Sequence, residues 1–272
     1  MTTPPKLTDR AALLRNRQRA AKSLETFVFD RVADEIKERL LEVNRSFTRV
    51  AVVSGFPEYW AQHFPQADQF ADEETLALAL ESYDLVIHAM ALHWANDLVG
   101  QLVQCRRALK KDGLLLATLF GGNTLNELRT ALAEAEVRHR GGLSPRIAPM
   151  AEIRDLGGLL QRACFALPVA DALPLSVSYG TLTSLMLDLR NMGESNALDS
   201  RLRRPSARGV FAEAASCYET SFKGADGRLQ ATFEVIFLTG WAPDESQQKP
   251  LRPGSAQARL ADALGAVEKK LD

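Results

Sequence analysis

Two histidines stand where a predicted strand ends, and they are the first candidates for chemistry. His88 and His93 follow the apolar run 83–87 and lie five positions apart. Imidazole titrates near neutral pH, so either side chain could act as an acid or a base in a cleft. A helical metal-binding pair needs a spacing of about four residues, and the sequence therefore predicts no metal site here. The alternative is that each histidine is simply hydrogen-bonded at a corner of the fold.

A glycine-rich turn follows the next apolar run. The segment 120–124 contains two consecutive glycines and leads into a predicted helix. Glycines expose backbone amides in front of a helix N-terminus, so this turn could cradle a phosphate or a carboxylate. A plain capping turn, with Asn123 or Thr124 as the N-cap, explains the same residues equally well. Trp94 could form the wall of a pocket nearby, although a single large aromatic residue more often belongs to the core.

The turn after the first predicted strand has few glycines for a nucleotide site. The strand 50–53 is followed by the turn 54–58, in which Gly55 is the only glycine. Nucleotide-binding α/β folds use glycines there because the backbone must approach the cofactor closely. Asp68 and Asp72 are the only aspartates before the next strand that could hold a ribose. The sequence therefore predicts an ordinary strand-to-helix turn that binds adenosine-type cofactors poorly.

Alternating strand and helix patterns predict an α/β fold that would position these residues. The runs 83–87 and 114–120 are apolar on both faces, which is typical of parallel strands covered by helices, and a helical pattern joins them. Ligands of such sheets bind at the carboxyl ends of the strands, where the histidines and the glycine-rich turn lie. Only 27 residues separate Gly55 from Tyr83. About one βαβ unit fits in that interval, so the first half of the sheet is expected to be short.

The remaining patterns define the organisation of the chain. Helices are expected over residues 123–140, 150–164, 182–192 and 207–222, a half-exposed strand over 173–179 and a final strand over 229–241. We divide the chain into an N-terminal helical segment (1–45), an α/β domain (46–242) with a helical insertion at about 181–223, and a tail (243–272) that ends in an amphipathic stretch.

Composition excludes several classes of partner. Lysine and arginine number 33 and aspartate and glutamate 34, so net charge gives no reason to expect nucleic acid. The three cysteines lie far apart, which indicates neither zinc nor a disulfide framework and favours a reducing compartment. No run of about 18 apolar residues could span a membrane. The basic N-terminus is expected to be a solvated or partner-facing helix rather than a transit peptide, which makes the predicted location cytoplasmic, with the mitochondrial matrix as the alternative.

Several segments of the chain resemble one known family. The segments Leu92–Leu98, Phe120–Leu125, Gly141–Ile147 and Met192–Asn196 look like those of the complex I assembly factor five family. That family belongs to the class I S-adenosylmethionine-dependent methyltransferase superfamily and is associated with arginine hydroxylation on an iron–sulphur subunit of respiratory complex I. The resemblance implies a Rossmann-like fold with a mostly parallel sheet, an antiparallel final strand and a helical insertion before it. It also implies that the substrate or protein partner is met by His93, Trp94, Phe120, Gly121, Gly122, Asn123, Thr124, Ser144, Arg146, Gly193, Glu194, Ser195 and Asn196.

The cofactor half departs from the pattern of the family. The family has an acidic, glycine-rich turn after the first strand, where this chain has Ser54–Glu58. The acidic strand ends of the family resemble both the segment around Asp68 and the segment around Asp72, which are too close together to end two strands. The resemblance therefore implies a remnant S-adenosylmethionine site at Ser54, Gly55, Asp68, Asp72 and His88. No catalytic residue is assigned.

The segments predicted to meet the partner match the family, whereas the cofactor half departs from it. Two functions are compatible with this difference. The first is a methyltransferase-like protein that binds a client subunit of complex I and whose S-adenosylmethionine site is degenerate. The alternative is an active S-adenosylmethionine-dependent methyltransferase that acts on a small molecule or a carrier-bound acyl chain.

The turn 54–58 allows a sharper prediction. Phe56 should fill the place of the methionine part of the cofactor, because a phenylalanine buries roughly 150 Å² or more. Pro57 removes a backbone donor, and Glu58 adds a negative charge near the carboxylate of the cofactor. We therefore expect no S-adenosylmethionine in the usual pose.

Overall fold

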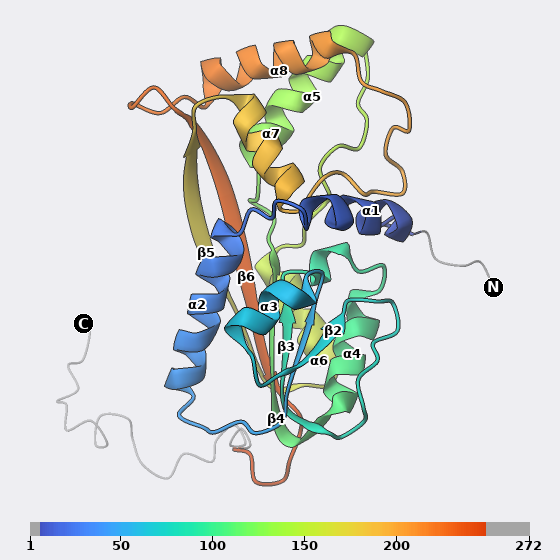
Figure 1. Ribbon diagram of the computed structural model, residues 1–272, viewed down its shortest axis with the longest axis vertical. Coiled ribbons are helices and arrows are strands. Elements are labelled where there is room, and N and C mark those ends of the chain that lie inside the picture. The colour runs from blue at the N-terminus through green and yellow to red at the C-terminus, as the bar shows by residue number, and fades with distance from the viewer. Residues whose placement is uncertain (1–5, 249–272) are drawn as a thin grey trace, which may run out of the picture.

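The computed structural model describes residues 6–248 and shows one six-stranded mixed sheet (Figure 1). The strands lie in the order β2-β1-β3-β4-β6-β5. Their bounds are β1 Val50–Ser54, β2 Asp68–Ala71, β3 Tyr83–Ala89, β4 Leu109–Phe120, β5 Ala166–Tyr179 and β6 Leu229–Trp241. Strands β2, β1, β3 and β4 are parallel to one another, whereas β6 pairs in the antiparallel sense with both β4 and β5. The predicted antiparallel final strand is thus confirmed, but it is inserted between β4 and β5 and does not form the edge of the sheet.

Helices cover both faces of the sheet. Their bounds are α1 Arg10–Ala20, α2 Phe27–Glu42, α3 Pro57–His63, α4 Leu98–Ala108, α5 Asn126–Arg140, α6 Ile153–Arg162, α7 Leu182–Asn191 and α8 Arg208–Ser221, with a 3₁₀ turn η1 at Leu92–Trp94. One core layer packs α2, α3, α5, α7 and α8 against one face of the sheet, and a second packs α4 and α6 against the other. The alternation of apolar residues along β6 explains this arrangement, because Phe237 points into the first layer and Leu238 into the second.

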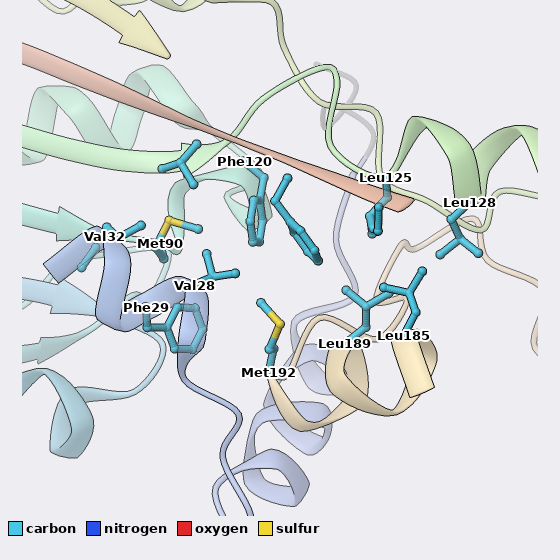
Figure 2. Close-up of a cluster of buried hydrophobic side chains, with 14 of the residues drawn as sticks. Val28, Phe29, Val32, Met90, Phe120, Leu125, Leu128, Leu185, Leu189 and Met192 are labelled. Carbon is cyan, nitrogen blue, oxygen red and sulfur yellow. The ribbon is translucent and has the colours of Figure 1, made fainter. Parts of the chain in front are cut away.

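The larger core layer continues past the end of the sheet to the helical insertion. Figure 2 shows Phe120 of β4 between Val28 of α2 on one side and Leu189 and Met192, at the end of α7, on the other. This continuity explains how α5, α7 and α8 are held above the strands: their apolar faces extend the same core. Gly141 ends α5 as predicted, in the left-handed conformation with φ of 68°.

The first half of the sheet is short, as predicted. Only β2, a strand of four residues, and the helix α3 separate β1 from β3. The N-terminal helix α1 lies across the carboxyl ends of the parallel strands, below α7 (Figure 1). A small third cluster joins Ala12 and Leu13 of α1 to Trp94 and Leu198. The N-terminal segment therefore covers the edge where ligands of such sheets bind.

Some expectations fall outside these elements. The amphipathic stretch of the predicted tail lies outside residues 6–248. Within the part that the structure describes, no helix has the length and apolar character needed to cross a bilayer.

Candidate functional site: two cavities above the strands

A cavity of about 700 Å³ lies over the turn that follows β1. Its walls come from Ser54–Tyr59 below, from α1 and the start of α2 above, and from Asp72 at one end. Pro57 occupies the first turn of α3, where its missing N–H costs no helical hydrogen bond. Phe56 packs on Phe29 with ring centroids 5.8 Å apart. The ring of Phe56 thus lies against α2 and lines the cavity beside Gly55 without filling it, and the expectation that it occupies the place of the methionine part of the cofactor stays a prediction.

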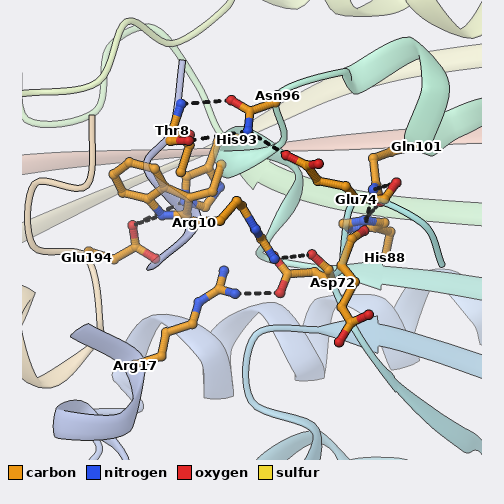
Figure 3. Close-up of polar contacts among 12 residues, drawn as sticks. Thr8, Arg10, Arg17, Asp72, Glu74, His88, His93, Asn96, Gln101 and Glu194 are labelled. Carbon is orange, nitrogen blue, oxygen red and sulfur yellow. Dashed lines mark hydrogen bonds and ion pairs between the residues drawn. The ribbon is translucent and has the colours of Figure 1, made fainter. Parts of the chain in front are cut away.

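Two arginines of α1 hold Asp72 at the end of this cavity. Arg17 Nη1 donates to Asp72 Oδ1 at 2.5 Å, and Arg10 Nη1 donates to Oδ2 at 3.3 Å. Figure 3 shows both guanidinium groups pointing at the aspartate. Burial alone would raise the pKa of Asp72, but Arg17 and Arg10 outweigh burial and hold it below its usual value. Asp72 is therefore ionised and already paired.

Arg17 also occupies the space directly above the glycine. A Cβ added at Gly55 would collide with the guanidinium of Arg17. The expectation of a solvated or partner-facing basic helix is thus wrong for this residue, whose side chain is only 7% exposed. The sequence gives little indication that Arg17 is buried, because it is one basic residue among several in the segment 6–22 and its acidic partner is 55 positions away.

The structure separates Asp68 and His88 from the cavity. Asp68 begins β2, level with Ala51 of β1, and pairs with Arg49 at 3.3 Å. It therefore stands at the opposite end of the strand from Asp72, because β2 runs between them. A single strand accounts for both acidic segments, which explains why they are so close together in the sequence.

His88 is buried on the other face of the sheet, against α4. The Gln101 amide donates to the carbonyl of Glu73 at 2.7 Å, which leaves its oxygen facing His88 Nε2 at 3.3 Å. This orientation assigns the hydrogen to Nε2. Burial lowers the pKa of His88, so the ring is neutral at pH 7. Of the two alternatives, the hydrogen-bonded corner histidine describes this residue.

These residues do not fit S-adenosylmethionine as they are arranged. Asp72, which directly follows β2 and is predicted to belong to a remnant cofactor site, accepts from two arginines, and Arg17 stands over Gly55. Ser54 Oγ is buried with no hydrogen-bond partner among the described residues, so this end of the cavity has one polar group left to satisfy.

A second cavity, of about 310 Å³, lies between the end of β4 and the helical insertion. Its walls are mostly apolar and include Phe120, Phe211 and Phe233. Seven residues predicted to meet the substrate or partner line it: Trp94, Phe120, Thr124, Arg146, Glu194, Ser195 and Asn196. Residues from four distant segments of the chain are thus brought to one place.

Glu194 is the carboxylate of this second cavity. Its Oε2 accepts from Trp94 Nε1 at 2.8 Å and is 3.1 Å from His93 Nε2 (Figure 3). The ring of His93 packs on Phe120 with centroids 5.0 Å apart, so both donors are fixed in position. Oε1 accepts no hydrogen bond from residues 6–248. Gly193, in the left-handed region with φ of 80°, makes the turn that aims Glu194 inward.

The other charges that border this cavity are neutralised by local partners. Arg146 donates to Glu136 Oε1 at 2.6 Å and to Ser206 Oγ at 3.0 Å. Ser144 donates to the same carboxylate through its backbone N–H, at 2.8 Å, and its hydroxyl. Burial opposes ionisation of Glu136, but these donors hold its pKa below the usual value. Sequence reasoning missed Glu136, whose only signal is a carboxylate inside a helical pattern.

The glycine-rich turn does not form an open anion cradle. Its amides serve a carboxylate of the same chain: Asn123 N donates to Glu234 Oε2 at 3.0 Å, and the Asn123 amide donates to Oε1 at 2.9 Å. A Cβ at Gly121 would collide with Glu234, and one at Gly122 would collide with Glu152. The capping alternative is also wrong, because α5 begins at Asn126 after Leu125, and neither Asn123 nor Thr124 is its N-cap. The turn instead fastens β4 to β6.

No group of three or more histidine, cysteine, aspartate or glutamate side chains suitable for a metal ion occurs within residues 6–248. The three cysteines are free.

Comparison with known proteins identifies the family to which the chain belongs. Residues 32–117 match the model of a methyltransferase domain. The zebrafish (Danio rerio) protein named arginine-hydroxylase NDUFAF5, mitochondrial, is 35% identical over 86% of this chain and 71% of its own length. The protein of that name from Dictyostelium discoideum is 41% identical over 68% of this chain, which spans only 42% of that relative. A malonyl-[acyl-carrier protein] O-methyltransferase of Xylella fastidiosa is 38% identical over 66% of this chain and 58% of its own length. With its methyltransferase-type α/β sheet and this level of identity, the chain belongs to the NDUFAF5 family.

Proposed function

We propose that this protein binds an arginine-bearing segment of a client protein, a subunit of respiratory complex I, in the cavity at Glu194. The observation that carries the proposal is a fixed carboxylate on the wall of a mostly apolar and aromatic cavity. An arginine side chain is complementary to such a cavity, because its methylene stem favours apolar surface and its guanidinium favours a carboxylate or an aromatic face. The name arginine-hydroxylase of the relatives points to the same side chain.

The charges around the cavity support an arginine rather than an anion. The guanidinium of Arg146 is committed to Glu136 and Ser206, so it does not neutralise Glu194. Oε1 of Glu194 remains available as an acceptor, and its desolvated position strengthens a charge-assisted hydrogen bond. The proposal concerns binding; the cofactor half holds the Arg17–Asp72 pair, and no catalytic step is assigned to the chain.

The test uses the purified protein and the iron–sulphur subunit of complex I from the same organism. We expect wild-type protein to bind this subunit, and Glu194→Gln to weaken binding on the order of 10- to 100-fold, because a hydrogen bond to a charged group contributes about 1.5–3 kcal/mol. The matched control is Glu219→Gln on the exposed side of α8, which should leave binding unchanged. Client variants that change each arginine to leucine in turn should identify one arginine whose loss mimics Glu194→Gln. Absence of binding by the wild type, or equal effects of the two glutamate variants, would contradict the proposal.

A genetic experiment tests the role in assembly. Loss of the gene should reduce the amount of assembled complex I on native gels, and a plasmid copy of the wild type but not of Glu194→Gln should restore it. An unchanged amount of assembled complex I in the deletion strain would contradict the proposal that the client is a complex I subunit. Fractionation of the same cells tests the predicted cytoplasmic location against the mitochondrial matrix, which the names of the relatives favour.

The second candidate function is transfer of a methyl group from S-adenosylmethionine to a carrier-bound acyl chain or a small molecule. The cavity of about 700 Å³ over Gly55 and the relative named as a methyltransferase of an acyl-carrier protein favour it. Equilibrium titration of the wild type with S-adenosylmethionine separates the two functions. Tight binding would support transfer, whereas our proposal expects none at physiological concentration.

A further inference from the structure

The helix α1 forms one wall of the cavity over Gly55 and contributes one buried arginine to it. Arg17 pairs with Asp72 Oδ1, and its guanidinium stands where a Cβ on Gly55 would lie. Arg10 holds the other carboxylate oxygen of Asp72 and also donates to its backbone carbonyl at 2.5 Å. A helix from the N-terminus of the chain thus neutralises the acidic group at the end of β2.

Separate contacts keep α1 in this place. Asp9 accepts from Ala12 N at 3.0 Å as the N-cap of α1 and pairs with Arg201 at 2.8 Å. Asn16 donates to the carbonyl of Ser195 at 2.9 Å. These attachments lie outside the cavity and tie the helix to the segment after α7. The position of Arg17 is therefore set by the helix and does not depend on Asp72 alone.

Apart from Arg17, the cavity has the size and the polar groups of a ligand-binding site. It is within the size range of small-molecule sites, roughly 300–1,000 Å³. Its walls carry three carboxylates, Asp30, Glu58 and Asp72, and Ser54 Oγ points to no partner among the described residues. Without Arg17, Oδ1 of Asp72 would be free to accept a hydrogen bond from a hydroxyl group in the cavity, while Arg10 still holds Oδ2, and the remaining carboxylates of the walls would favour a positive charge.

We propose that α1 is an autoinhibitory strap, whose Arg17 closes a site that is otherwise able to bind a ribose-bearing, positively charged ligand. This inference rests on the proposed function, in which the protein does not bind S-adenosylmethionine, and it gives a structural cause for that loss of binding. Closure comes from the Arg17–Asp72 pair rather than from the sequence of the turn Ser54–Glu58. The ligand binds only when α1 has moved, and its apparent affinity is reduced by the fraction of molecules in which α1 has moved.

S-Adenosylmethionine is the probe, because it combines a ribose with a positive charge, and binding is measured by calorimetry on the full chain. Minor conformations are commonly populated at about 0.1–10%, so Arg17→Gln should tighten binding by at least about tenfold over the wild type. Arg15→Gln, on the exposed side of the same helix, is the matched control and should bind like the wild type. Asp72→Asn should gain no affinity, because it frees Arg17 but removes the negative charge and one of the two acceptor oxygens.

Three results would overturn the proposal: no gain for Arg17→Gln, an equal gain for Arg15→Gln, or a gain for Asp72→Asn. The first would leave the proposed function standing and attribute the lost affinity to the turn itself. Tight binding by the wild type would instead contradict the lost cofactor site, which is part of the proposed function.

A measurement on the wild type avoids any folding defect of the variants. At millimolar S-adenosylmethionine, amide hydrogen exchange within residues 10–20 should speed up, because the ligand selects molecules in which α1 has moved. Slower or unchanged exchange in α1 would overturn the strap even if Arg17→Gln failed to fold.

Discussion

At the scale of single residues, three carboxylates in or beside the two cavities each have their own hydrogen-bond donors. Asp72 is held by two arginines, Glu136 by Ser144 and Arg146, and Glu194 by Trp94 and His93. The difference matters for function. Asp72 and Glu136 are paired with arginine side chains, whereas Glu194 Oε2 contacts the rings of Trp94 and His93 and its Oε1 accepts no hydrogen bond from residues 6–248.

The Asp72 pair predicts how stability depends on pH. Its pKa is lower in the folded chain than in the unfolded chain, so its contribution is complete above the unfolded value of about 4 and is lost as pH falls through the folded value. We expect the free energy of unfolding in urea to fall below pH 5, and to fall less steeply in Asp72→Asn. Asp34→Asn, an exposed change on α2, serves as the control. Parallel pH profiles for wild type and Asp72→Asn would show that the pair contributes nothing.

At the scale of elements, the segment after α7 connects the two cavities. Gly193 lies against Phe56 of the first cavity, and the next residue, Glu194, faces the second. The helix α1 contacts the same segment through Asn16. A shift of this segment would therefore change both sites.

Gly193→Ala tests this connection. A Cβ there would lie 2.8 Å from Phe56 Cζ and 3.3 Å from Arg17 Cγ, and the backbone has φ of 80°. We expect a loss of about 1–3 kcal/mol in unfolding free energy, from backbone strain and from the contact with Phe56, together with weaker client binding. Gly142→Ala is the control, because nothing lies within 4 Å of its Cβ, and it should change stability by less than about 0.5 kcal/mol. Equal losses for the two variants would rule out the packing argument.

At the scale of the whole molecule, β6 ties the two core layers into one structure. Phe237 and Leu238 are adjacent in the chain and fully buried, and they pack into opposite layers. The helical insertion belongs to the same layer as α2 and α3, because buried side chains of α7 and α8 belong to the same apolar cluster. The fold should therefore unfold as one unit.

Two core substitutions check this expectation. Phe237→Ala should cost about 3–5 kcal/mol and Leu238→Ala about 2–5 kcal/mol. Each should lower the midpoint of the same single transition in calorimetry, with the two-state ratio of enthalpies preserved. Two transitions, with each substitution affecting a different one, would show that the layers are separate folding units.

The order and type of most elements followed from the sequence alone. The unbroken apolar run of β3 and the alternation along β6 report local burial, and burial patterns with periods of 2 and 3.6 residues can be read without knowing the fold. The rule that ligands bind at carboxyl ends of parallel strands then placed Trp94 and Phe120 in one region, and the resemblance to the family added Glu194. Comparison with known proteins confirmed that family.

Only the tertiary structure decided which charges are available to a ligand. Arg17 looked like one more basic residue of a solvated helix, yet its partner Asp72 is 55 positions away. Glu234 accepts a hydrogen bond from the glycine-rich turn, although it lies 111 positions away in the sequence. The strand β2 places Asp72, and not Asp68, at the end that faces the cavity. The physical reason is that periodicity is a property of neighbouring residues. The partner of a buried charge is set by which distant strands and helices the fold brings together.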